Sequence, residues 1–134
     1  QELKLLDNAL EKILTLTTDA FEFDDARTAS QVEPLEQVID ILVERLRAQH
    51  IKRLKDGACS IDTGVVYLDV LNNVERISDH CSNIAARLVG MEAGEDYDSH
   101  TLKNMMHHNP TKEYMLNYEQ CRKDYLIPLE QLEA

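Results

Sequence analysis

The chain has 134 residues and a formal net charge of -11, a length that fits one domain with one hydrophobic core. An acidic surface repels nucleic-acid phosphates and anionic lipids, so we expect no nucleic-acid partner. The three cysteines are widely spaced and form no C-x-x-C pair, which argues against a disulfide framework and a thiolate zinc site and favours reduced thiols in the cytosol. No run of about 18 apolar residues is present, so we expect no membrane span in this segment.

Composition predicts an all-α domain. Glycine and proline are few, Leu, Ile, Glu, Lys and Gln fill long stretches, and no strand-like alternation is sustained. We expect residues 1–134 to form a single antiparallel up-and-down bundle of three to four helices.

The first expected helix covers about residues 1–23. Its apolar residues recur at spacings of three and four, namely Leu3, Leu6, Leu10, Ile13, Thr17 and Ala20. Asp24 and Asp25 end or restart the helix. The second expected helix covers about residues 33–56, because Pro34 suits a first turn. Its expected core stripe is Leu35, Val38, Ile39, Leu42 and Leu46.

Gly57 is a good helix stop, and Ser60 or Asp62 can cap a third helix over about residues 62–89, before Gly90. Its expected core stripe is Val70, Val74, Ile77, Cys81, Ile84 and Leu88. Beyond it we expect an acidic loop over 91–99, a short helix over 100–108, and a tail helix over about 112–127 that starts at Thr111 and breaks or bends at Pro128. The tail carries an amphipathic stripe, predicted to close the core, with a docking face as the alternative: Tyr114, Tyr118, Cys121 and Tyr125.

Two Glu-x-x-x-Asp pairs, Glu36/Asp40 and Glu75/Asp79, are the most informative feature of the chain. Side chains four apart lie on one face of a helix, about 5–6 Å apart. The pairs are centred on residues 38 and 77, 19 and 20 residues either side of Gly57. If the chain folds back at Gly57, the four carboxylates come level across a helical hairpin.

Converging carboxylates repel one another unless something positive balances them. Oxygen ligands favour a hard divalent or iron-type cation such as Mg, Ca, Mn or Fe. The same acidic residues could instead be solvated surface charge, or part of a salt-bridge network with Arg47, Arg53 and Arg76. The sequence leaves these alternatives open. His80 points away from Asp79, and His50 lies too far along its helix from Asp40 to share one ion. We expect His50 to lie at the helix surface or to form a hydrogen bond between helices.

The run 71–85, LNNVERISDHCSNIA, closely resembles the pattern N-x-E-R-I-x-D-H-x-x-N-I-A of PhoU-type domains. The runs 32–40 and 50–54, followed by Gly57, look like the preceding helix of that family, so the resemblance covers about residues 25–90. It implies a PhoU-like three-helix bundle with a metal cluster at its surface. Carried over residue by residue, the metal ligands it implies are Glu36, Asp40, Glu75 and Asp79.

PhoU proteins carry two tandem three-helix repeats, whereas this chain carries one. It looks more like the PhoU-like cytoplasmic domain attached to bacterial sodium/phosphate cotransporters, and its start at Gln1 fits a piece cut from such a protein. The resemblance therefore implies regulation of phosphate transport and phosphate homeostasis at the cytoplasmic face of the membrane. It also implies the membrane transporter part of the parent chain as partner, and it leaves a homodimer open.

Three other function classes fit less well. A ferritin-like di-iron enzyme would need Glu-x-x-His, which the chain lacks, and no nucleophile-base set is visible, so we expect no enzyme. His100 to Asn104 partly resembles the H-x-L-K-G core of histidine phosphotransfer domains, with Asn104 in place of glycine. A metal-free helical interaction domain is the third alternative.

Overall fold

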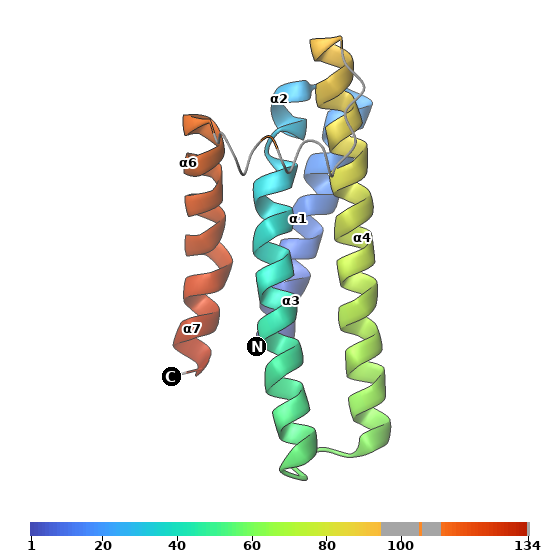
Figure 1. Cartoon of the computed structure of the whole chain (residues 1–134), viewed down its shortest axis with the longest axis vertical. Helices are drawn as coiled ribbons and strands as arrows, with labels where there is room; N and C mark the ends of the chain where they lie inside the picture. Colours follow the sequence, from blue (N-terminus) through green and yellow to red (C-terminus); the bar gives the residue numbers. More distant parts are fainter. Residues whose placement is uncertain (95–104, 106–110, 134) are drawn as a thin grey trace.

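The computed structural model describes residues 1–94, 105 and 111–133, and it confirms the all-α bundle (Figure 1). Three long helices form the body: α1 (Glu2–Glu22), α3 (Val32–Lys55) and α4 (Ile61–Ala93). The short α2 (Ala26–Ala29) joins the first two. The chain runs up α1, down α3 and up α4, so α1 and α4 point in the same direction. No helix in the described residues is both long and apolar enough for a membrane span.

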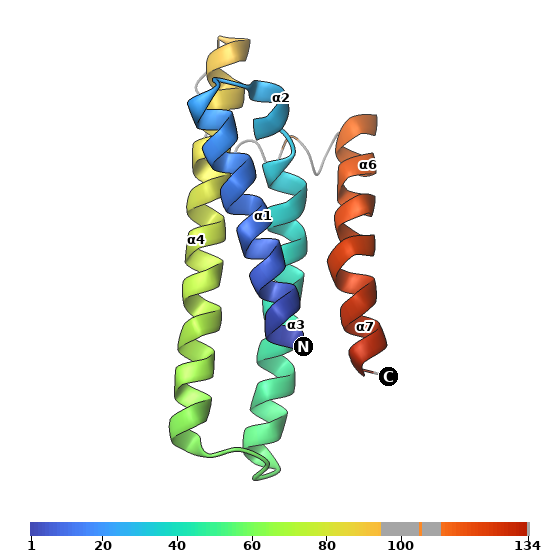
Figure 2. The same ribbon diagram turned by 180° about the vertical axis from the view of Figure 1, so that it is seen from behind.

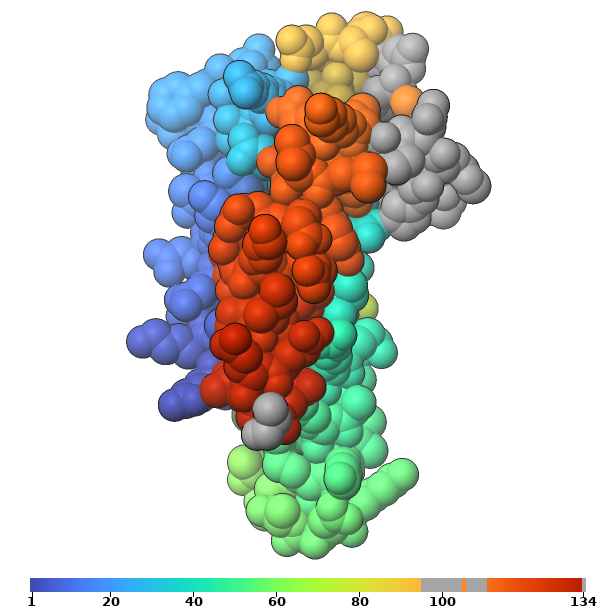
Figure 3. Space-filling model, turned by 90° about the vertical axis from the view of Figure 1, so that its left-hand side faces the viewer, coloured from blue at the N-terminus to red at the C-terminus, as the bar shows by residue number. Residues whose placement is uncertain are grey.

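A fourth rod packs beside this bundle. It consists of α6 (Lys112–Cys121), a π-helical turn η1 (Arg122–Leu126) and α7 (Ile127–Glu133). Figure 3 shows α6 and α7, in orange and red, lying over α1 and α3. The sequence predicted a break or bend at Pro128, but the rod continues to Glu133. A proline ring clashes with the carbonyl four residues earlier, and the wide π turn directly before Ile127 accommodates it.

Short polar side chains cap the first turns of α2, α4 and α6, whereas α1 and α3 begin without a side-chain cap. The Asp25 carboxylate accepts hydrogen bonds from the backbone N–H groups of Arg27 (3.1 Å) and Thr28 (3.2 Å). Ser60, rather than Asp62, caps α4, with its hydroxyl oxygen 3.2 Å from the backbone nitrogen of Thr63. These caps satisfy N–H groups that have no partner inside the helix.

The end of α4 differs from the expected one. The sequence placed it at Val89, before Gly90, but Gly90 is buried inside the helix and α4 runs to Ala93. Gly94 terminates it in the left-handed conformation, with φ 74°. A glycine stops a helix where the chain needs a positive φ, which Gly94 adopts and Gly90 does not. The expected helix over 100–108 lies outside the described residues, apart from Met105.

The core confirms the stripe expected on α3 and corrects the one expected on α4. Every residue of the α3 stripe is buried. On α4, however, Val70, Ile77 and Ile84 are 44%, 37% and 42% exposed, and the residues that follow each of them are buried instead: Leu71, Ser78 and Ala85. Hydrophobicity alone selected the larger side chains. At two of the three positions the smaller residues, Ser78 and Ala85, point inward, because α4 packs closely against both α1 and α3.

The end of the hairpin near Gly57 is held by an aromatic contact between α3 and α4. His50 is buried and stacks on Tyr67 with ring centroids 4.2 Å apart. Its Nδ1 accepts a hydrogen bond from Arg53, at 3.2 Å, because a guanidinium can only donate. Nearby, a Cβ at Gly64 would lie 2.5 Å from Leu54 Cδ2, so a larger residue there would require the Leu54 side chain to move. His50 is therefore buried rather than at the helix surface, and it contacts α4 by ring stacking rather than by the expected interhelical hydrogen bond.

Candidate functional site

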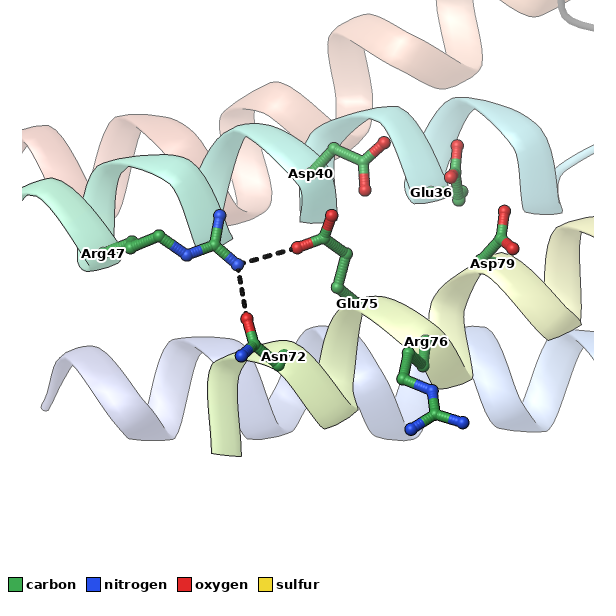
Figure 4. Close-up of a pocket in the computed structure, with 7 residues that line it drawn as sticks. All are labelled: Glu36, Asp40, Arg47, Asn72, Glu75, Arg76 and Asp79. Carbon is green, nitrogen blue, oxygen red and sulfur yellow. Dashed lines mark hydrogen bonds and ion pairs between the residues drawn. The ribbon is translucent and has the colours of Figure 1, made fainter. Parts of the chain in front are cut away.

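The α3–α4 side of the bundle contains a groove with a volume of about 590 Å³. All four carboxylates singled out by the sequence line it, together with two arginines and an asparagine (Figure 4). The lining residues are Glu36, Asp40, Arg47, Asn72, Glu75, Arg76 and Asp79. The helical hairpin therefore brings Asp40 and Asp79 to the same side of the molecule.

Helix geometry explains why the acidic residues meet. Glu75 directly follows buried Val74, and Asp79 directly follows buried Ser78, so both lie about 100° from the core direction on the same flank of α4. That flank faces α3. The nearly equal distances of the two pairs from the turn at Gly57 then bring them level. In Figure 4, Asp40 lies opposite Glu75, and Glu36 lies opposite Asp79.

The four carboxylates differ in their exposure to solvent. Glu36 is buried, with 2% of its surface exposed, and Asp40 is intermediate. The Glu75 side chain is 45% exposed, and Asp79 is also exposed. The groove is thus dry at its α3 wall and wet at its α4 wall, so added positive charge would be felt most strongly at Glu36.

Arg47 already connects the two helices within this groove. Its Nη2 donates to Glu75 Oε2 and to Asn72 Oδ1, both at 2.9 Å, and its Nη1 donates to Glu44 Oε1 at 2.7 Å. The hydrogen bond to Glu75 raises the pKa of the Arg47 guanidinium. The Arg76 guanidinium, by contrast, points away from the carboxylates (Figure 4). The salt-bridge network considered from sequence is therefore present around Arg47.

Carboxylate oxygens from both α3 and α4 face the groove, and oxygen ligands are those that a hard cation prefers. Among residues 1–94, 105 and 111–133, however, no three His, Cys, Asp or Glu side chains are grouped as ligands for one ion in their present positions. Glu75 is engaged by Arg47 instead. A cation in this groove would need side-chain rotation at Glu75, and the rotation would release Arg47.

A second buried glutamate, Glu33, and a nearby tyrosine on the tail rod were not singled out from the sequence as parts of the site. Glu33 is 2% exposed on the first turn of α3, where its Oε1 accepts from Gln37 Nε2 at 3.2 Å. Tyr114 of α6 lies close by. Burial, and then the charges of Glu33 and Glu36, raise the pKa of the Tyr114 phenol. The only signal in the sequence was that Tyr114 belongs to the stripe expected to cover the core.

Comparison with known proteins identifies the family. The family model described as PhoU domain matches residues 3–88, which include α1, α3, most of α4 and all four carboxylates. This chain belongs to the PhoU domain family. The fold and the hairpin that carries the groove are therefore those of a PhoU domain.

Two curated relatives support this assignment. The chain is 25% identical over 96 residues to the phosphate-specific transport system accessory protein PhoU homolog 1 of Thermotoga maritima, covering 72% of this chain and 41% of the relative. It is 34% identical over 79 residues to the PhoU homolog of Streptococcus pneumoniae, covering 59% and 37%. The chain thus spans about two fifths of these relatives. No solved structure matches it.

Proposed function

We propose that this PhoU domain regulates phosphate transport as the cytoplasmic regulatory domain of a sodium-dependent phosphate transporter, whose membrane part belongs to the same parent chain. Family membership supports the role in phosphate homeostasis, since the relatives are named as accessory proteins of phosphate-specific transport systems. An accessory role needs no catalytic group, which fits the expectation that the domain is not an enzyme.

We further propose that the groove between α3 and α4 holds a hard divalent or iron-type cation. The observation that carries this proposal is that Glu36, Asp40, Glu75 and Asp79 all line one groove from two helices. A bound cation would supply positive charge that neutralises the four carboxylates and links the helices. Its ligands would be these same four residues.

Arg47 gives the domain two alternative arrangements of the groove. Its guanidinium holds Glu75 at 2.9 Å, so Glu75 can serve either Arg47 or an ion, but not both in the same geometry. When Glu75 turns toward the other carboxylates, Arg47 keeps Glu44 as its acid partner at 2.7 Å. The charge presented along the α3 surface then changes, which offers the transporter a docking face that depends on the state of the groove.

Metal analysis tests the cation proposal. Natively purified protein should contain a stoichiometric divalent or iron-type metal, and the variant Glu75→Ala/Asp79→Ala should lose it. Asp69→Ala is the matched control, because Asp69 is an exposed acidic residue of α4 outside the groove. Equal metal content in wild type and the double variant would contradict the proposed metal site.

Phosphate uptake tests the regulatory role separately. In cells that express the parent gene, alanine at all four carboxylates should change the sodium-dependent uptake of labelled phosphate at unchanged transporter abundance. Asp69→Ala should leave uptake as in wild type. Uptake that stays the same even after deletion of residues 1–134 would contradict the regulatory role.

A metal-free interaction domain is the second candidate, and the contacts of Arg47 favour it. Arg47 already neutralises part of the acidic groove through Glu44, Asn72 and Glu75. If neither preparation contains metal while uptake still responds to the groove variants, this candidate replaces the cation proposal. The phosphotransfer alternative rested on His100, which lies outside the described residues.

A further inference from the structure

The closed end of the α3–α4 hairpin extends beyond the rest of the bundle. Opposite views show α3 and α4 continuing past the start of α1 and the end of α7 to the turn at Gly57 (Figures 1 and 2). Large apolar side chains are exposed on this extension, namely Ile51 at 40%, Ile61 at 77% and Val65 at 61%. Contact between such side chains and water is unfavourable, so a partner that covers them gains binding free energy.

These apolar residues belong to the same two rows as the acidic residues of the groove. The α4 row is Ile61, Val65, Leu68, Asn72, Glu75 and Asp79, at alternating intervals of four and three residues. The α3 row is Asp40, Glu44, Arg47 and Ile51, with the same intervals. Residues at this spacing share one flank of a helix, and members of both rows line the groove. We call the two rows together the α3–α4 face.

The α3–α4 face is acidic at one end and apolar at the other. Its acidic half holds four carboxylates, its apolar half holds the three exposed side chains of the hairpin end, and Arg47 lies between the halves. Arg47 shows that the groove suits a guanidinium, because its Nη2 donates to Glu75 and to Asn72, both at 2.9 Å. The net charge of -11 adds attraction for a basic partner at longer range.

We propose that the α3–α4 face binds an amphipathic helix that carries arginine over the acidic half and apolar side chains over the apolar half. This inference rests on the proposed regulatory role, in which this side of the domain docks on the transporter, and it names the chemistry of the docking segment. Two neighbouring helices offer a groove for a third, and the arginine fork matches carboxylate oxygens. Asp79 follows Ile61 by 18 residues, so the docked helix is about 27 Å long.

A cation in the groove would weaken this docking. The arginine of the partner and the cation are attracted by the same carboxylates, so binding of one lowers the affinity for the other by an equal factor. The apolar half keeps its contacts in both states. The groove would therefore change the strength of docking, whereas the hairpin end would fix its position.

Peptide titration tests the docking face. The probe is a dye-labelled helical peptide of about 18 residues, with leucine on one half of its buried stripe and arginine on the other. In EDTA it should bind wild type with a Kd of about 10 μM by fluorescence anisotropy, and added salt should weaken binding. A peptide with glutamate in place of arginine should bind at least about tenfold more weakly.

Matched variants locate the bound peptide. Val65→Glu should weaken binding at least about tenfold, whereas Val66→Glu should leave it as in wild type. Val66 is a neighbouring valine at 64% exposure, about 100° round the helix from Val65 and off the face. Asp40→Asn/Asp79→Asn should weaken binding to a similar degree. Its control is Asp7→Asn/Glu11→Gln, an exposed pair on α1 with the same loss of charge. Helical circular dichroism should be the same in all these proteins.

Three results would overturn the docking face: no binding of the arginine peptide to wild type, equal binding of the glutamate peptide, or equal effects of Val65→Glu and Val66→Glu. Binding of wild type, but not of Val65→Glu, to anionic phospholipid vesicles that displace the peptide would assign the face to a membrane and overturn the helix. Because these titrations use neither metal nor transporter, their failure leaves the metal and uptake tests of the proposed function intact.

Manganese tests the competition. Mn²⁺ that is bound at the groove, as measured by metal analysis of the same sample, should weaken the arginine peptide and leave the glutamate peptide unweakened. Bound Mn²⁺ without an effect on the arginine peptide would overturn the competition alone. No bound Mn²⁺ in wild type would contradict the cation proposal and the competition with it, and the docking face would still be judged by the titrations in EDTA.

Discussion

The two flanks of α1 are both apolar, yet the residues that the structure describes cover only one of them. On one flank Leu16 packs beneath the tail rod, beside Cys121 and Tyr125. On the other flank Leu14 and Phe21 remain exposed next to α4. The covered flank contributes to stability because its partner is always present. The open flank is left in contact with water by the described residues, so its side chains contribute less to stability.

Truncating a leucine on each flank should give the largest difference. Leu129 of α7 is fully buried, so Leu129→Ala should lower the free energy of unfolding by about 2–5 kcal/mol. Leu14→Ala removes the same atoms from a side chain that is 42% exposed and should cost under about 1 kcal/mol. Urea unfolding of dilute protein measures both changes in the free energy of unfolding. Similar losses would show that the tail rod does not complete the core.

The thiol under the tail rod should give the next effect. Burial raises the pKa of Cys121 from 9.0 to about 11. The folded state therefore holds this proton more tightly than the unfolded state, so the stabilisation is complete below pH 9 and is lost as the pH rises toward 11. Near pH 10 wild type should lose about 1 kcal/mol relative to Cys121→Ala. Parallel pH profiles of the unfolding free energy for the two proteins would show that the thiol is not buried under the rod.

The smallest effect concerns the third side of the bundle, where α3 meets α4. Arg47 and Glu75 are each partly exposed, so their coupling in a double-mutant cycle with Arg47→Met and Glu75→Gln should be about 0.5 kcal/mol. The cycle is measured by urea unfolding without added metal and should weaken in high salt. A cycle with Arg45→Met and Glu130→Gln on the tail side is the control for an exposed pair. Zero coupling between Arg47 and Glu75 would mean that Arg47 does not compete with a cation for Glu75.

Sequence reasoning succeeded where spacing alone determines position. The spacing of three and four residues correctly predicted which residues of α3 are buried. The nearly equal distances of the two acidic pairs from Gly57 correctly predicted that the four carboxylates lie on one side of the hairpin. It failed on α4, where Ile77 seemed a better core residue than Ser78, because the distance between helix axes decides which residue fits inside and that distance is not encoded locally. The sequence also could not predict which arginine pairs with Glu75. Several arginines are long enough to contact it, and the packing of α3 against α4 determines that Arg47 does so.

Ile77, Ser78 and Asp79 follow one another, and each serves a different side of the bundle. Each residue turns a helix by about 100°, so deleting one residue between Gly57 and this triplet would send the carboxylate of Asp79 inward and the hydroxyl of Ser78 outward, whereas inserting one would send Ile77 inward and turn Asp79 out of the groove. Changes in length along α4 should therefore be accepted almost only in steps of seven, two full turns, which restore all three directions together.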